Sequence, residues 1–186
     1  MRKLLPLFLG IALFLSCNNP KPAEETATTV GPAEAAPAAP ATSPTGGTFA
    51  DAKYAKMGKE GLAKFAAEDF DGFFANHADN VVWLFNNGDS IAGKAAVIDY
   101  WKKRFTESVD SIAFSNEVWL AVNVVNPQAV EAPGIWLMGW YQVSAKYKTG
   151  KRMGQWMHVD MHFNANDQID RVIQYMDRVP IAAAMK

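Results

Sequence analysis

The chain has little cysteine, little histidine and no excess of charge of either sign. Cys17 is its only cysteine, and 18 Lys and Arg residues against 19 Asp and Glu give a net charge of -1 over 186 residues. A single cysteine excludes an intrachain disulfide framework. The balanced charge offers no basic surplus to attract nucleic acid, so we expect no nucleic-acid partner. No motif indicates a cofactor, and we expect none.

An apolar run long enough for a comfortable transmembrane helix is also missing. The N-terminus carries Arg2 and Lys3, followed by "LLPLFLGIALFLS", which ends at Cys17. The stretch "LFLSC" resembles a bacterial lipoprotein signal, in which the chain is cut before a cysteine that becomes acylated. The resemblance implies a signal peptide over residues 1–16 and a lipidated Cys17 that anchors the protein in the bacterial cell envelope. Whether the anchored protein faces the periplasm or the cell surface stays open. An unmodified thiol behind an uncleaved signal is the alternative.

Aromatic residues are absent from residues 18–48, which contain eight Ala, six Pro and six Thr. Such a segment cannot bury enough apolar surface to offset the entropy of ordering it. We therefore interpret residues 17–48 as the lipidated cysteine followed by a disordered tether. Residues 49–186 are then the folded domain.

Beyond residue 48 the sequence is aromatic-rich and shows clear periodicity. The stretch "FADAKYAKMGKEGLAKFAAEDF" has apolar residues at helical intervals, and Asp69 fits the N-cap of a second, short helix. "NVVWLFN" predicts a strand and "GKAAVIDYWKKRFTES" a third helix. Strand-like runs follow over residues 111–124, 134–147, 152–163 and 168–178. This order predicts an α+β domain with helices packed against one face of a curved sheet.

The order of these elements resembles the NTF2-like superfamily, including its SnoaL-like and steroid-isomerase-like branches. The resemblance covers residues 50–181, and its best local matches are "AAEDFDGFFANHADNVVWLF", "IAGKAAVIDYWKKRF" and "HFNANDQIDRVIQYMD". It implies a cone-shaped α+β barrel with about three helices on a curved, mostly antiparallel sheet. It also implies a cavity between helices and sheet, and frequent dimerisation through the sheet.

Two of the three histidines lie in "WMHVDMHF", residues 156–163. Alternate residues of a strand share a face, so one face is wholly apolar and carries Met157, Val159, Met161 and Phe163. The opposite face carries Trp156, His158, Asp160 and His162. The two histidines would lie roughly 13 Å apart along a regular strand, too far to share one zinc ion. We therefore expect no metal site and assign the apolar face to the core.

The predicted sheet is apolar on both faces, so both faces need cover. In residues 134–147, Trp136 and Trp140 share a face opposite to Leu137 and Tyr141. A second copy packed sheet to sheet would bury the outward aromatic residues, which predicts a homodimer. The expected interface contains Trp119, Trp136, Trp140, Trp156, His158, Asp160 and His162. A β-bulge would exchange the two faces, and that possibility stays open.

Five apolar or aromatic residues are candidates for the cavity lining: Trp83, Phe85, Trp101, Val159 and Met161. Ordinary core packing is the alternative for each of them. The catalytic polar positions of the steroid-isomerase-like branch align with Gly61, Phe85 and Val159, and none of these side chains can transfer a proton. Isomerase chemistry of that kind is therefore not expected.

The leading hypothesis is a tethered protein that binds a small apolar or amphipathic molecule in an aromatic-lined cavity. Whether it is also an enzyme stays open, with a non-enzymatic role favoured. One alternative is a hydrolase, isomerase or cyclase with His158 and Asp160 as catalytic residues, which requires both side chains to point into the cavity. Another is a protein-interaction module of the cell envelope that uses the Trp-bearing sheet face.

Native mass spectrometry of the protein is expected to show a homodimer. Lipophilic ligands are expected to raise its melting temperature, because a ligand that binds only the folded state stabilises that state. A monomer that no lipophilic ligand stabilises would contradict the leading hypothesis.

Overall fold

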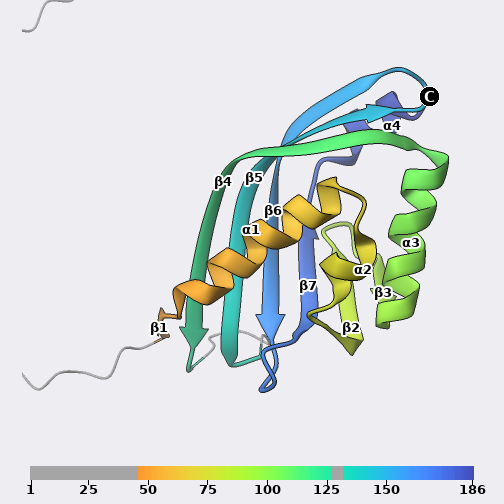
Figure 1. Cartoon of the computed structure of the whole chain (residues 1–186). Coiled ribbons are helices and arrows are strands. Elements are labelled where there is room, and N and C mark those ends of the chain that lie inside the picture. Colours follow the sequence, from red (N-terminus) through yellow and green to blue (C-terminus); the bar gives the residue numbers. More distant parts are fainter. Residues whose placement is uncertain (1–45, 127–131) are drawn as a thin grey trace, which may run out of the picture. The chain divides into compact units, whose positions relative to one another are not determined.

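The computed structural model of the chain describes residues 46–126 and 132–186. Within these ranges the chain forms four helices and seven strands, shown in Figure 1. In chain order they are β1 (Gly47–Phe49), α1 (Ala52–Ala66), α2 (Phe70–Phe74), β2 (His77–Phe85), β3 (Ser90–Ala92), α3 (Lys94–Glu107), β4 (Val109–Val124), β5 (Gly134–Tyr147), β6 (Arg152–Phe163), β7 (Ile169–Tyr175) and α4 (Arg178–Ala184).

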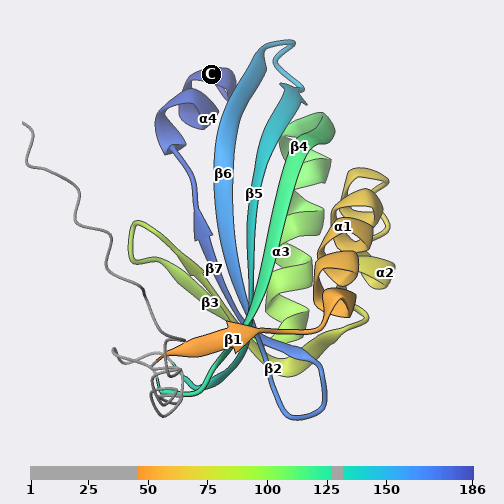
Figure 2. The same ribbon diagram turned by 90° about the vertical axis from the view of Figure 1, so that its left-hand side faces the viewer.

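The strands form one sheet in the order β1-β4-β5-β6-β7-β2-β3. Neighbouring strands are antiparallel except β2 and β7, which run parallel. The long strands β4, β5 and β6 curve, and α1, α2 and α3 lie on one side of them (Figures 1 and 2). Helix α4 packs beside the β5–β6 hairpin, where the Thr149 hydroxyl donates to the Ala184 carbonyl at 2.6 Å. The predicted α+β fold on a curved, mostly antiparallel sheet is confirmed.

Element boundaries follow the sequence pattern most closely in the long strands, where β5 and β6 span the predicted residues. The predicted N-cap is also present, since the Asp69 carboxylate accepts the Gly72 N–H at 2.9 Å. The last predicted strand ends early because Asp177 caps α4, accepting the Val179 N–H at 2.8 Å. Helix α4 and the three-residue strands β1 and β3 were not predicted. No helix in the described ranges is both long and apolar enough to cross a bilayer.

The helix-facing side of β6 is the apolar face predicted from its alternation. Met157, Val159, Met161 and Phe163 are all buried, and so is Leu137, which pairs with Met161 in the neighbouring strand. The four apolar residues of β6 therefore lie on the concave face of the sheet. His158 and Asp160 lie on the opposite face, called the outer face below.

Strand β4 contains a β-bulge that changes which side chains face the helices. Ser115 pairs with Gln142 and Val118 with Trp140, so three steps along β4 correspond to two along β5. Asn116, inside the bulge, has a φ of 53°. Such an extra residue reverses the alternation of the strand. Phe114 faces the helices before the bulge, and Trp119 faces them after it.

The Trp119 ring occupies space that two glycines leave open. A Cβ added at Gly58 of α1 would lie 2.7 Å from Cζ3 of Trp119, and one added at Gly139 of β5 would lie 2.4 Å from the same atom. On its other side the ring meets Tyr141, with ring centroids 5.9 Å apart. Trp119 is thus held between α1 and the sheet.

The substitution Gly58→Ala is expected to lower the free energy of unfolding by about 1–2 kcal/mol, because its methyl group would overpack the Trp119 ring. The matched control is Gly61→Ala on the same helix, where the added Cβ would meet the Phe73 ring at an ordinary 3.5 Å. There the helix propensity of alanine should raise stability by up to about 1 kcal/mol. Urea denaturation measures both, and an equal gain in the two variants would contradict the packing constraint on Trp119.

Candidate functional site

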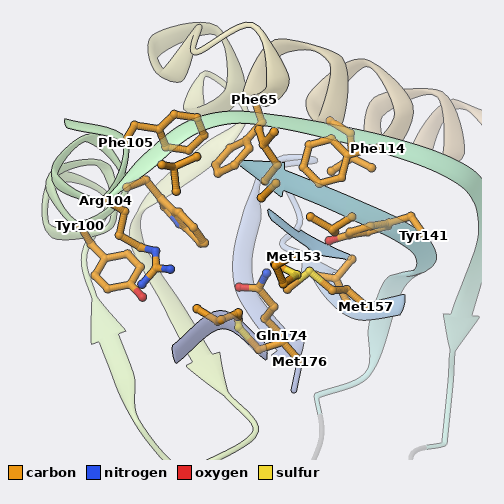
Figure 3. A pocket seen from close by; sticks show the side chains of 18 of the residues that line it. Phe65, Tyr100, Arg104, Phe105, Phe114, Tyr141, Met153, Met157, Gln174 and Met176 are labelled. Carbon is orange, nitrogen blue, oxygen red and sulfur yellow. The ribbon is translucent and has the colours of Figure 1, made fainter. Parts of the chain in front are cut away.

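A cavity of about 240 Å³ lies between the helices and the concave face of the sheet (Figure 3). Nine aromatic side chains and five methionines line it. Aromatic rings offer large apolar surfaces, and methionines adapt their shape to what they contact. The wall can therefore accommodate an apolar body of varied outline.

The aromatic wall on the helix side is built around Phe65 of α1. Its ring packs edge-on against Trp101 and Phe105 of α3, with centroids 5.0 and 5.5 Å away. Trp101 and Phe105 are four residues apart, which places them on one face of α3. Met157 and Val159 of β6 supply the opposite, sheet-side wall.

Gln174 of β7 is a buried polar residue in this otherwise apolar wall. Its Oε1 accepts the indole N–H of Trp83 at 3.1 Å. Since an indole nitrogen can only donate, this bond fixes the amide orientation and leaves Nε2 as a donor toward the cavity. No hydrogen bond within the described residues reaches Nε2.

Two further donors of the lining have no partner among the described residues. The Trp101 indole nitrogen is buried without a hydrogen bond, and no hydrogen bond reaches the hydroxyl of Tyr141. Burial, with a smaller contribution from the negative charge of Glu117, raises the pKa of Tyr141 far above its usual value of 10. Tyr141 therefore stays a neutral phenol that can donate. A buried donor left unpaired costs about 1–3 kcal/mol, which an acceptor on a ligand would offset.

The cavity opens between α3 and α4. Eight lining residues are not fully buried: Tyr100, Arg104, Ile112, Phe114, Met176, Arg178, Ala182 and Met185. All but Ile112 and Phe114 of β4 come from α3, α4 and the residues flanking α4. Figure 3 shows the Arg104 guanidinium turned toward the cavity beside Tyr100. Among the described lining residues no side chain is a carboxylate or an imidazole. The cavity thus presents hydrogen-bond donors and positive charge, and no side chain that acts as a general base at neutral pH.

The predicted pocket residues mostly surround this cavity. Trp83, Trp101, Val159 and Met161 line it. Phe85 is buried next to it, where its ring lies 5.7 Å from the Tyr100 ring and 5.2 Å from the Arg178 guanidinium. Tyr141, Gln174 and Arg104 were not named from the sequence.

His158, Asp160 and His162 lie on the outer face, away from the cavity. His158 Nε2 lies 2.8 Å from Asp160 Oδ1, and Nδ1 lies 3.0 Å from the Gly139 carbonyl oxygen. His162 pairs instead with Asp170 of the neighbouring strand β7, with Nδ1 2.6 Å from Oδ1. Its Nε2 lies 3.1 Å from the Pro133 carbonyl oxygen. The proposed catalytic pair therefore does not face the cavity. No group of three metal-ligating side chains occurs within the described residues.

The tryptophans expected at a dimer interface divide between different environments. Trp140 and Trp156 are 37% and 54% exposed on the outer face, beside Tyr175 at 42%. Trp136 shares that face but is buried, with its indole N–H donating to the Ala132 carbonyl at 2.9 Å. Trp119 lies on the helix side, contrary to expectation, because the β4 bulge reverses its alternation. Cys17, the predicted lipidation site, lies outside the described residues.

His77 is a buried histidine at the start of β2. It is 1% exposed, and its ring packs against Phe73, Phe74 and Trp83. Neither ring nitrogen has a hydrogen bond within 3.5 Å among the described residues. Burial, and then the positive charge of Lys94, lowers its pKa from 6.5 to about 4, against a smaller opposing contribution from the Phe73 backbone.

No protein-family model matches the chain, and no curated protein matches it. Solved structures do. They include a proposed polyketide cyclase from Xanthomonas campestris pv. campestris, at 17% identity over 71% of this chain and 96% of that chain, with a TM-score of 0.57. An NTF2-like protein of unknown function from Burkholderia pseudomallei matches at 14% identity, 71% and 96% coverage, and a TM-score of 0.56.

A third match is a protein with a ketosteroid isomerase-like fold from Catenulispora acidiphila, solved in complex with trimethylamine. It is 8% identical over 70% of this chain and 92% of that chain, with a TM-score of 0.52. At such identities these likenesses define the fold alone. The described domain has the NTF2-like fold, as the resemblance implied.

The buried His77 predicts a loss of stability in acid. Below pH 6.5 the unfolded chain binds a proton that the folded chain takes up only near pH 4. The free energy of unfolding should therefore fall as the pH drops between these values, by on the order of 3 kcal/mol from this residue. His77→Phe should remove that component, and urea denaturation across this pH range measures it. Parallel pH profiles for the parent and the variant would contradict the prediction.

Proposed function

We propose that this protein binds a small apolar or amphipathic molecule in the cavity between α3, α4 and the concave sheet face. The observation that carries the proposal is a hollow of about 240 Å³ lined by aromatic and methionine side chains, with an unpaired donor on Trp101 among the described residues and further donors on Tyr141 and Gln174. Apolar pockets with a few polar groups of fixed orientation are the usual form of small-molecule sites.

The size of the hollow supports binding over ordinary core packing. Protein interiors are close-packed and contain few voids larger than a water molecule. A hollow of about 240 Å³ is much larger than such voids. A ligand that fills it would bury the apolar surface of its wall.

Catalysis by His158 and Asp160 has no geometric support, since both side chains lie on the face opposite the cavity. The cavity itself contains no carboxylate or imidazole among the described residues. We therefore favour binding over turnover. The tether predicted at Cys17 would hold the binding domain at a membrane surface.

We also propose that the outer face is a homodimer interface. The exposed Trp140, Trp156 and Tyr175 support this, because large aromatic residues gathered on one sheet face are typical of surfaces that become covered. The alternative is a different envelope protein on the same face. The mass of the native assembly distinguishes the two.

The substitution Ala145→Phe is expected to reduce binding of 1-hexanol by about tenfold or more, because the new ring would occupy the cavity that Ala145 lines. The matched control is Ala113→Phe, on the neighbouring strand one position along, where the side chain is exposed on the outer face. Isothermal titration calorimetry measures both, and a circular dichroism spectrum verifies folding. Equal binding by the parent, the Ala145 variant and the control would place the ligand elsewhere and contradict the proposal.

A further inference from the structure

The two charged side chains that line the described cavity are both arginines, but their surroundings differ. Arg178 is exposed and already paired, with its guanidinium 3.0 Å from the Asp89 carboxylate. Arg104 is half-buried, and among the described residues no carboxylate lies within ion-pair distance of it. Its guanidinium instead contacts aromatic groups, lying 5.9 Å from the Tyr100 ring centroid and beside the Tyr147 hydroxyl. Arg104 is therefore a cation of the lining without an anionic partner in the described structure.

Gln174 complements Arg104 from the other side of the cavity. Figure 3 shows the Arg104 guanidinium and the Gln174 amide directed into the same space, from α3 and β7 respectively. The Trp83 indole N–H holds Oε1 of Gln174, so the amide can present only N–H donors to this space. A planar guanidinium and an amide N–H together match the two oxygens of a carboxylate.

The remaining wall is apolar and excludes a ligand that is charged along its length. Phe114 and Met157 lie across the cavity from Arg104 in Figure 3, and Phe65 and Met153 lie between them and Arg104. A cationic head group would find no carboxylate in the described lining and would face Arg104, so like charges would repel. The lining therefore selects for a negative head group and an apolar body.

We propose that the ligand is a small organic anion, a monocarboxylate whose head group is bound by Arg104 and by Nε2 of Gln174. Its apolar body lies among Phe65, Phe114, Met153 and Met157. This inference rests on the proposed function and specifies the ligand of the same cavity. Hexanoate, a short monocarboxylate with a six-carbon chain, is a suitable probe for a cavity of about 240 Å³.

The test compares three probes that share one apolar body and differ in the head group: hexanoate, 1-hexanol and hexylammonium. Isothermal titration calorimetry with the unmodified full chain at neutral pH should give about tenfold or more tighter binding for hexanoate than for hexanol. Hexylammonium should bind more weakly than hexanol. This series requires no substitution, so it does not depend on whether a variant folds.

Arg104→Met then assigns the preference to one residue. The variant keeps an apolar stem of similar length, so its affinity for hexanol should stay within about threefold, while its affinity for hexanoate should fall to that of hexanol. The matched control is Lys103→Met, which removes the same charge from an exposed position on α3 that pairs with Glu107. The control should keep the preference for hexanoate.

The possible failures of this test are distinguishable. If hexanol binds and hexanoate binds no more tightly, the proposed carboxylate site is wrong while the apolar cavity stands. If Lys103→Met abolishes the preference as fully as Arg104→Met does, the effect comes from net charge and the carboxylate site is also wrong. If none of the three probes binds, the proposed function itself fails.

Discussion

One extra residue in β4 determines which side chains enter the concave side of the sheet. Before the bulge Ile112 and Phe114 face the helices, and beyond it Trp119 and Ala121 do. A regular strand would send Trp119 outward and bring Val118 inward. With the bulge, the Trp119 ring fills the space beneath α1, where Gly58 and Gly139 lack side chains to compete with it. The hollow that remains lies toward α3 and α4, and the position of the cavity follows from this packing.

The chemistry of the cavity follows from what burial does to its few polar groups. Trp83 orients Gln174 and thereby determines that its amide nitrogen is free to donate. Burial keeps Tyr141 protonated, so its hydroxyl remains available as a donor. Arg104, at the solvent side, keeps its charge partly hydrated and near the opening. An apolar body with an anionic end complements Arg104 and Gln174, whereas catalysis by proton abstraction would need a base that the described lining lacks.

Much of this fold could be predicted from period-two and period-3.6 patterns, and the failures have local causes. The alternation in residues 156–163 assigned Met157 and Val159 to the core and His158 to the outer face, because a regular strand preserves parity. Trp119 was assigned to the wrong face because one inserted residue exchanges the two faces of the strand beyond it. Such an insertion leaves no reliable mark in the sequence. Tyr141 could have been predicted as a cavity residue, since it lies four residues from the buried Leu137 and therefore on the same face of its strand. Arg104 and Gln174 could not, because only the tertiary fold directs them into one space.

The most direct test of a filled cavity uses the methionines as reporters, in a ¹³C-methyl NMR titration of the full chain with hexanoate. The lining contains Met153, Met157, Met161, Met176 and Met185, whereas Met57 lies on α1 outside this lining and Met138 lies on the outer face. If the ligand enters the cavity, the five lining resonances shift together with one dissociation constant, and those of Met57 and Met138 do not move. Shifts confined to Met138, or no shift at saturating hexanoate, would contradict binding in this cavity.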